Sequence, residues 1–472
     1  MIKLGVTVLR SKRLAMVKAA CLLGVGAAAV AAMTARADAE TLQQALISAY
    51  GGNPTLNADR ARQRATDEQV PQALSGWRPT VEVNGSYGYT DTDTTTALGM
   101  SSNGSTDPGN FSITLTQPLF RGFKTVNSTR QAEANVDAGR ESLRGTEQNV
   151  LLNGVVAFMN VIQDRQIVDL RRKNVEVLRE QLRATQARFN VGEVTRTDVA
   201  QSRARLSESL SALSVAQANL AASVANYVRV IGHSPDGLVF PSLPEHLIPK
   251  TLKSAIAAGD ANNPDVGVAS FTEEASRYAV EVARGDLLPQ VSLQAEYSWS
   301  HEPSLSVDKS ESTSILGAVT MPLYQGGAVY SQVRQAKQTN SQRRIQILEA
   351  RRAAREAVVQ AWNNLDAARQ TIVSTTEQVR AQELAYEGVK QEAEVGTRTT
   401  LDVLNAEQEL VNARVSVVTA RRDRIVAAYQ LIAAMGRLNV QQLSLPVAPY
   451  NPDVNYQNVR YKLFGTGIGG TE

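Results

Sequence analysis

Two long proline-free intervals constrain how this chain can fold. No proline lies between Pro118 and Pro235 or between Pro322 and Pro446, and both intervals are rich in Ala, Gln, Arg, Glu and Leu. These residues favour or tolerate helix, whereas proline breaks it. Each interval is far longer than a mean helix of about 11–12 residues. The first interval predicts a helix over Lys124–Asn190, on the order of 100 Å long, and a return helix of roughly 35 residues.

The two intervals belong to two copies of one pattern. The repeated pieces are Asn53–Pro54 and Asn263–Pro264, "QPLFRG" from Gln117 and "MPLYQG" from Met321, and "VGEVTRTDV" from Val191 and "VGTRTTLDV" from Val395. The first pair is displaced by 210 residues and the other pairs by 204, so the first copy has six extra residues in its polar loop after Tyr89. Self-similarity at one long spacing indicates an internal tandem duplication.

Each copy is predicted to run in the same order. A helix (about residues 41–75 and 251–285) comes first, then two strands, the long helix, a glycine corner and the return helix. The first return helix has apolar residues at coiled-coil spacing, namely Leu206, Leu210, Leu213, Leu220, Val224 and Tyr227. An ordinary helical bundle would share this spacing, but helices of this length usually pack against copies of themselves.

Residues 1–39 have the three-part pattern of a secretory signal peptide, and their length and small-residue end fit a membrane anchor poorly. The whole chain has 49 Lys and Arg and 46 Asp and Glu, and this segment holds six of the basic residues and one of the acidic ones. The mature chain would therefore have 43 basic and 45 acidic residues. The near-neutral mature chain removes the charge argument for a nucleic-acid partner. Cys21, the only cysteine, leaves with this segment. No later apolar run is long enough for a spanning helix, so any membrane crossing must use strands.

Four segments alternate apolar and polar residues as strands do: 80–89, 111–116, 291–299 and, less regularly, 314–324. Outer-membrane barrel strands and a soluble sheet with one wet face share this alternation. Open strand edges cannot face lipid, and the smallest usual barrel has about eight strands. Four strands per chain therefore favour an oligomer, in which two chains would supply about eight strands and three would supply about twelve.

The ordered set of motifs resembles the TolC-like outer membrane efflux proteins over nearly the whole mature chain. The sharpest matches are "RFNVGEVTRTDV" (188–199) and "VGTRTTLDVLNAEQELVNAR" (395–414). The resemblance implies a mixed α/β membrane protein, trimeric, with a 12-stranded outer-membrane β-barrel continuous with a long periplasmic α-helical coiled-coil tunnel. The expected parts are a signal peptide (1–39), two structural repeats (40–240 and 251–436), a linker (241–250), and a C-terminal equatorial segment and tail (437–472).

The same resemblance implies a passive exit duct in the outer membrane for efflux or type I secretion. A periplasmic adaptor and an inner-membrane RND, ABC or MFS transporter would recruit this homotrimer and open it at the helical tip. The tip residues expected to contact the adaptor are Val191, Gly192, Val395, Gly396 and Thr397.

The glycine corners carry the candidate pore residues. Gly192 and Gly396 suit the left-handed residue that ends a helix, and Asp198 and Asp402 suit the first turn of the next helix, where each can cap free N–H groups. In a trimer each aspartate would form a carboxylate ring that attracts cations.

The resemblance assigns further tip residues. It makes Arg398 the tip arginine that helps to hold the entrance shut, with Asp198 as its partner, and Arg196 is an additional restraint. Asn405 stands where the family has a second aspartate and Ala393 where it has a tyrosine, so we expect one strong Asp402 ring and a weaker lock.

Other function classes fit less well. The three histidines are scattered, and neither a phosphate-binding loop nor metal-ligand spacing is present, so no enzyme activity, cofactor or metal is predicted. An exported coiled-coil fibre or adhesin would explain the long helices but not the duplicated strands. The basic runs "RRAAR" (351–355) and "RRDR" (421–424) read as solvated helix faces rather than a nucleic-acid site.

Overall fold

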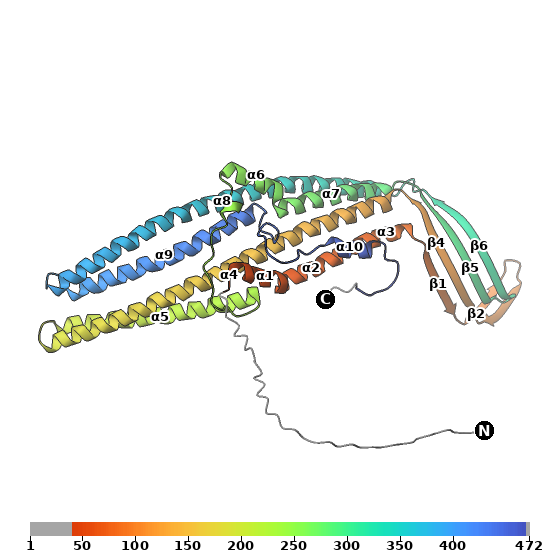
Figure 1. Cartoon of the computed structure of the whole chain (residues 1–472). Coiled ribbons are helices and arrows are strands. Elements are labelled where there is room, and N and C mark those ends of the chain that lie inside the picture. The colour runs from red at the N-terminus through yellow and green to blue at the C-terminus, as the bar shows by residue number, and fades with distance from the viewer. Residues whose placement is uncertain (1–39, 469–472) are drawn as a thin grey trace, which may run out of the picture. The chain divides into compact units, whose positions relative to one another are not determined.

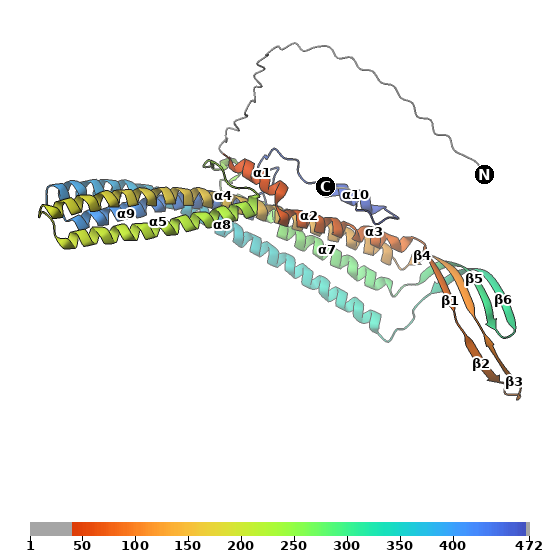
Figure 2. The same ribbon diagram turned by 90° about the horizontal axis from the view of Figure 1, so that it is seen from below.

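The computed structural model describes residues 40–468. The predicted signal peptide, residues 1–39, therefore lies outside the described residues. The described chain combines a small antiparallel sheet with long helices, which Figures 1 and 2 show from two sides. Among the helices of residues 40–468, none is sufficiently long and apolar to cross a membrane.

Two long helical hairpins dominate the structure. The first joins α4 (Lys124–Asn190) to α5 (Arg196–Ile231), and the second joins α8 (Ala328–Glu394) to α9 (Thr400–Ala434). Both long helices have 67 residues, which is about 100 Å at the rise of an α-helix. The bounds of α4 are those predicted from the sequence. The helices of each hairpin lie side by side, and α4 also contacts α9 (Figure 1).

The helices that open the two halves are not continuous, so the predictions of single helices over 41–75 and 251–285 were wrong. The observed elements are α1 (Leu42–Gly52), α2 (Pro54–Asp67), α3 (Gln69–Leu74), α6 (Leu252–Asn262) and α7 (Pro264–Gly285). Asn53 and Asn263 have extended backbones, and each side chain accepts hydrogen bonds from the next helix, whose first residue is proline. An asparagine N-cap followed by proline begins a new helix at both places.

These shorter helices cover the part of each long helix that its return helix does not reach. Helices α1, α2 and α3 contact α4, helix α7 lies against both α4 and α8, and α6 contacts α8. Near the C-terminus α10 (Asp453–Arg460) contacts α2 and α3. Short 3₁₀ turns occur at Ser75–Trp77 and Glu245–Leu247.

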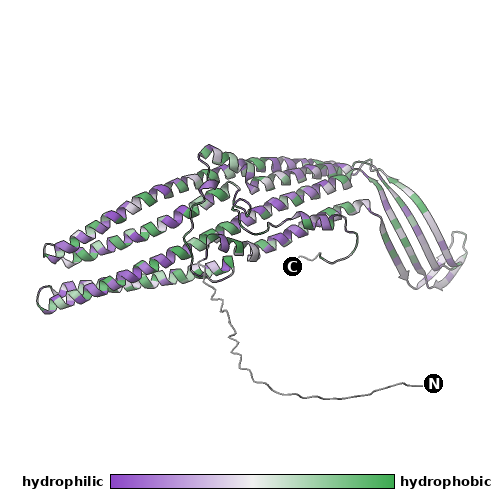
Figure 3. Ribbon diagram, in the orientation of Figure 1, coloured by the Kyte–Doolittle hydropathy of each residue, from purple (hydrophilic) through white to green (hydrophobic). Residues whose placement is uncertain are grey.

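A four-stranded antiparallel sheet has the order β1 (Thr80–Tyr87), β4 (Gly109–Arg121), β5 (Gln290–Ser304) and β6 (Val307–Thr320). Its register aligns apolar residues across all four strands, as in the row Val81, Leu115, Ala295 and Ile315. The adjacent row on the opposite face is Glu82, Thr114, Glu296 and Ser314. The predicted alternation is therefore confirmed, and Figure 3 shows it along the strands.

The polar segment after Tyr89, predicted as a loop, is a second hairpin of β2 (Thr90–Thr95) and β3 (Ser101–Thr106). This hairpin extends the β1–β4 pair: between the two pairs, the Gly88 N–H donates a hydrogen bond of 3.0 Å to the Pro108 carbonyl. Threonine favours strand through its branched Cβ, and backbone pairing does not require apolar side chains. The four strands counted from sequence are the four of the larger sheet.

The main hydrophobic core lies where the two hairpins meet α1, the linker and the C-terminal segment. Its fully buried residues include Leu46, Phe158, Tyr227, Leu365, Ile425 and Leu438. They come from both halves of the chain. The two halves of the chain therefore share one hydrophobic core, a contact that the sequence pattern did not predict.

The buried seam between α5 and α4 differs from the predicted leucine seam. Ser202, Ser209 and Ala216 are buried at seven-residue intervals, whereas Leu210 is 38% exposed. Small residues let two helices approach closely. The first part of the predicted seam therefore lies on the flank of α5, whereas its last part, Leu220, Val224 and Tyr227, belongs to or packs against the main core.

Candidate functional site at the hairpin tips

Both hairpin tips use the same turn. Gly192 and Gly396 have φ values of +80° and +83°, in the left-handed region that glycine adopts without strain. At the first tip the Gly192 N–H donates to the Phe189 carbonyl, and the Glu193 N–H donates to the Arg188 carbonyl. At the second tip Gly396 and Thr397 donate in the same way to the carbonyls of Ala393 and Glu392. This is the Schellman arrangement, and it satisfies the last carbonyls of α4 and α8.

Each return helix starts with a capping box. The Thr195 hydroxyl accepts from the Asp198 N–H at 3.3 Å, and the Asp198 carboxylate accepts from the Thr195 N–H at 2.9 Å. The corresponding distances for Thr399 and Asp402 are 3.2 and 3.0 Å. The aspartates therefore lie in the first turn as predicted, and a threonine is the N-cap residue itself.

The electrostatics of Asp402 follow from this box. Hydrogen bonds from the backbone N–H and the hydroxyl of Thr399 lower the pKa of Asp402 below that of an ordinary aspartate, and Arg398 lowers it further. Asp402 therefore keeps its negative charge at neutral pH.

The contact of Arg398 differs from the one expected by resemblance. Its Nε lies 2.8 Å from Glu392 Oε2 of the same hairpin, and Asp198 is held by its own N-cap threonine. Within one chain, the expected Arg398–Asp198 pair is therefore not formed. The first tip carries the reverse arrangement, with Arg188 at the helix end and Glu193 after the glycine, 3.7 Å apart.

Two other predicted residues have different surroundings. Arg196 is the first residue of α5 and is exposed. Asn405 accepts a hydrogen bond of 2.7 Å from Nη2 of Arg205, which connects α9 of one hairpin to α5 of the other. Arg205 also pairs with Glu208 at 2.9 Å. Sequence analysis did not identify Arg205, because its partner lies 200 residues away.

The residues predicted to contact an adaptor all lie on the outside of the two tips. Val191 and Val395 are 78% and 76% exposed, and Gly192, Gly396 and Thr397 are exposed beside them. Each tip therefore presents one exposed valine side chain next to the exposed backbone of the glycine turn. Ala393 is partly buried and contributes only its carbonyl to the turn.

A buried acid that the sequence analysis missed lies deeper in the second hairpin. Glu407 is 7% exposed on α9, and burial raises its pKa. A hydrogen bond from Tyr386 and the charges of Arg414 and Lys390 lower the pKa in part. Acidification therefore protonates Glu407 before it protonates Asp402.

Comparison with known proteins places this arrangement in a wider group. The family model described as "Outer membrane efflux protein" matches residues 41–233 and 258–437. The outer membrane efflux protein BepC of Brucella suis is 39% identical over 434 residues, which cover 90% of this chain and 92% of that protein. The outer membrane protein TolC of Escherichia coli is 28% identical over 86% of this chain and 84% of that protein.

The fold also matches solved structures. The crystal structure of the Campylobacter jejuni CmeC outer membrane channel superposes with a TM-score of 0.75 over 89% of both chains. The two sequences are 19% identical, so this likeness concerns the fold.

Proposed function

This chain belongs to the outer membrane efflux protein family, and from that membership we propose that three copies form an exit duct through the outer membrane. The duct is passive and serves efflux or type I secretion. It is a channel and not an enzyme, and its long helices extend into the periplasm.

The observation that carries the proposal is the four-stranded sheet. Its apolar face is open to the surroundings, since Val81, Val83 and Ile315 on that face are 61%, 62% and 72% exposed. Within the described chain, β1 and β6 each pair on one side only. Three such sheets joined edge to edge give twelve strands and leave no open edge, which lipid requires. The apolar face then meets the membrane.

The long helices support the same assembly. Helix α8 leaves apolar side chains open to solvent, namely Ile345, Leu348, Val373 and Leu384, which are between 53% and 78% exposed. Their spacing of 3, 25 and 11 residues keeps them within one face of α8, which supports an interface along that face. In the trimer these residues pack on a neighbouring copy, and the helices form a tunnel below the barrel.

The domain assignment fits this duct. The repeats 40–240 and 251–436 arise from tandem duplication and each supply two barrel strands and one hairpin. The linker 241–250 and the segment from 437 form an equatorial belt, supported by Leu247, Leu438 and Leu445, which join one core.

The hairpin tips form the closed inner entrance. Asp402 and Asp198 recur around the axis as rings that select cations, and Arg398, Arg196 and Asn405 hold the tips together. A periplasmic adaptor docks on the valine and glycine of each tip, and an RND, ABC or MFS transporter supplies the energy.

Single-channel conductance of the purified protein in a planar bilayer, measured under a salt gradient, tests the duct. We expect a small, cation-selective conductance from a species whose mass is three chains. A folded, membrane-inserted trimer without conductance would reject the duct and favour an exported fibre.

A further inference from the structure

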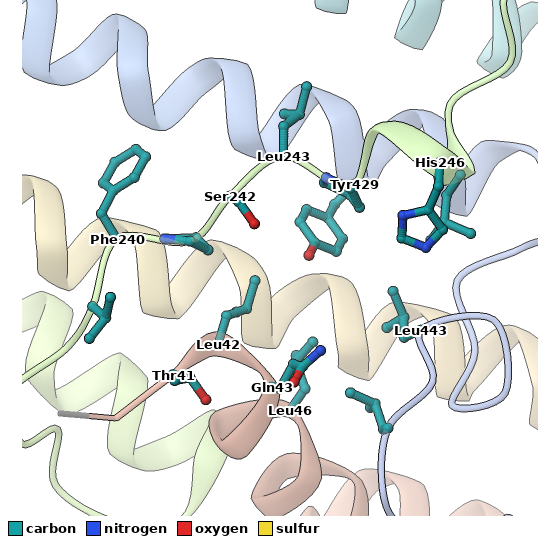
Figure 4. A pocket seen from close by; sticks show the side chains of 15 residues that line it. Thr41, Leu42, Gln43, Leu46, Phe240, Ser242, Leu243, His246, Tyr429 and Leu443 are labelled. Carbon is teal, nitrogen blue, oxygen red and sulfur yellow. The ribbon is translucent and has the colours of Figure 1, made fainter. Parts of the chain in front are cut away.

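A cavity far from the hairpin tips combines an apolar lining with unused polar groups. It has a volume of ≈ 540 Å³ and lies between the start of α1, the linker, α9 and the C-terminal segment. Figure 4 shows its lining, of which Leu42, Leu46, Leu243 and Leu443 supply apolar surface. This volume lies in the usual range of small-molecule sites, about 300–1,000 Å³.

One polar group points into this cavity from α9. Tyr429 is 6% exposed and lines the cavity, and among residues 40–468 no protein group hydrogen-bonds its hydroxyl. Figure 4 shows that hydroxyl directed into the space beside Ser242 and above Leu42 and Gln43. Burial raises the pKa of Tyr429 to about 12, so the group keeps its proton and can donate. Since the hydroxyl opens onto the cavity, an acceptor bound there could take its hydrogen bond.

The start of α1 adds further donors on the same cavity. Thr41 is the N-cap and exchanges hydrogen bonds with Gln44. Within the described residues, the backbone N–H groups of Leu42 and Gln43 have no partner, as is usual for the first turn of a helix. No acidic residue lies in this turn. Free N–H groups at the start of a helix favour an anion, and Leu42 and Gln43, which carry two of them, line the cavity.

The charges around the cavity agree with an anionic ligand. Its polar lining consists of Thr41, Gln43, Ser242, His246 and Tyr429, and no aspartate or glutamate belongs to it. The nearest acid along the chain is Glu40, whose Oε1 lies 3.5 Å from His233 Nε2. Its carboxylate does not line the cavity.

We propose that this cavity binds a small amphipathic anion, with its apolar body among the leucines and its carboxylate at Tyr429 and the start of α1. Such a ligand would join α1 of the first half to α9 and the C-terminal segment of the second. The site is independent of the pore residues and of the proposed docking surface at the tips.

The test uses octanoate as the probe and the assembled full-length protein in lipid nanodiscs, with isothermal titration calorimetry and empty nanodiscs as the blank. We expect saturable binding of one octanoate per chain. Tyr429→Phe removes only a hydroxyl and should weaken binding by about tenfold, the usual effect of one hydrogen bond to a charged group. Tyr227→Phe alters another buried tyrosine that does not line the cavity, and it should leave the affinity unchanged.

Octanamide has the same chain without the charge and should bind at least about tenfold more weakly than octanoate. Octanoate heat no greater than the nanodisc blank, equal affinity for octanamide, or equal effects of the two tyrosine variants would each overturn the proposal. A structure of the assembly with the cavity filled by a neighbouring copy would overturn it as well.

Discussion

At the scale of single residues, Asp402 combines a structural role with an electrostatic one. Its carboxylate caps the first turn of α9 and also places a negative charge at the tip. We predict that Asp402→Ala lowers cation selectivity, seen as a shift of the reversal potential toward zero in a salt gradient. Asp402→Glu keeps the charge and should retain most of the selectivity. An unchanged reversal potential in Asp402→Ala would show that the pore charge lies elsewhere.

The pH dependence of this selectivity follows from the lowered pKa of Asp402. A carboxyl group whose pKa is lower in the folded state contributes stability above its unfolded pKa and loses it as the pH falls through the folded pKa. In a single chain the cap should therefore persist through mildly acidic pH and disappear only below the ordinary aspartate range, at about 3.9. In the proposed ring the three carboxylates repel one another, which acts in the opposite direction, so cation selectivity should be lost at a higher pH than the cap. Reversal potentials and thermal stability, both measured from pH 7 downward, check this order, and a loss of stability before the loss of selectivity would contradict it.

The pair of Arg398 and Glu392 gives a second prediction at this scale. Both side chains are about half exposed, so the pair should contribute little to overall stability. If it holds the turn in its closed position, Arg398→Ser and Glu392→Gln should each raise single-channel conductance. Glu193→Gln, which removes the looser 3.7 Å pair of the first tip, is the matched control and should change conductance less. Equal conductance in all variants would place the lock at another contact.

The residues predicted best from sequence are those whose roles are local. Gly192 and Gly396 follow from the need for a left-handed residue, and Asp198 and Asp402 from the start of a helix. The partners Glu392 of Arg398 and Arg205 of Asn405 could not be predicted. Such contacts depend on how far each helix rotates about its axis and on which helices become neighbours, and a local pattern contains neither.

At the scale of helices, two equivalent glycines should tolerate substitution very differently. Gly232 ends α5 and Gly436 follows α9, and both have positive φ, +103° and +72°. A Cβ at Gly232 would meet nothing within 4 Å, whereas one at Gly436 would lie 2.1 Å from the Asn262 carbonyl oxygen. Gly232→Ala should therefore cost only the left-handed strain of about 1–2 kcal/mol. Gly436→Ala should cost considerably more, because the backbone of α6 must move.

Thermal unfolding of the purified assembly, followed by tryptophan fluorescence, separates the two variants. Gly436→Ala should lower the midpoint far more than Gly232→Ala, or prevent assembly altogether. Gly388→Ala, inside α8 with open space around its Cβ, is the control. It should raise the midpoint slightly, because glycine within a helix costs about 0.5–1 kcal/mol relative to alanine. Equal losses at Gly232 and Gly436 would contradict the steric argument.

Helices and strands were predictable to different extents. The bounds of α4 followed from composition and from the turn after Asn190, because both act locally. The repeated Asn–Pro motif at Asn53 and Asn263 is visible in the sequence. It begins a new helix, and it therefore also ends the preceding one, which the prediction of single helices did not take into account. The β2–β3 hairpin has no apolar alternation, since neither of its faces is buried, so periodicity could not reveal it.

At the scale of the whole molecule, the contact between the two hairpins near their tips should influence opening. Arg205 of α5 bonds Asn405 of α9, and the two hairpins must separate there if the tunnel is to widen. We predict that Arg205→Ala raises the open probability of single channels. Arg203→Ala removes a neighbouring exposed arginine of the same helix and serves as the control. An identical open probability in both variants would exclude this contact from gating.

The sequence supports the proposed assembly only as a requirement for more than one chain. Four strands with an apolar face demand a partner, yet the strands themselves do not distinguish two copies from three. The family resemblance supplied the number three, and the exposed row of α8 supports an interface without counting the copies. Stoichiometry depends on the angle between neighbouring subunits, which no segment of one chain encodes by itself.

The closed hydrogen bonding of each hairpin tip has a consequence for how the channel responds to heat and denaturant. Each turn satisfies its own backbone groups within about a dozen residues, through the glycine turn and the threonine box. Moving a tip as a rigid body therefore breaks none of these bonds within the turn. Opening should accordingly have a low activation enthalpy, and moderate urea should leave its rate nearly unchanged until the helices themselves unfold.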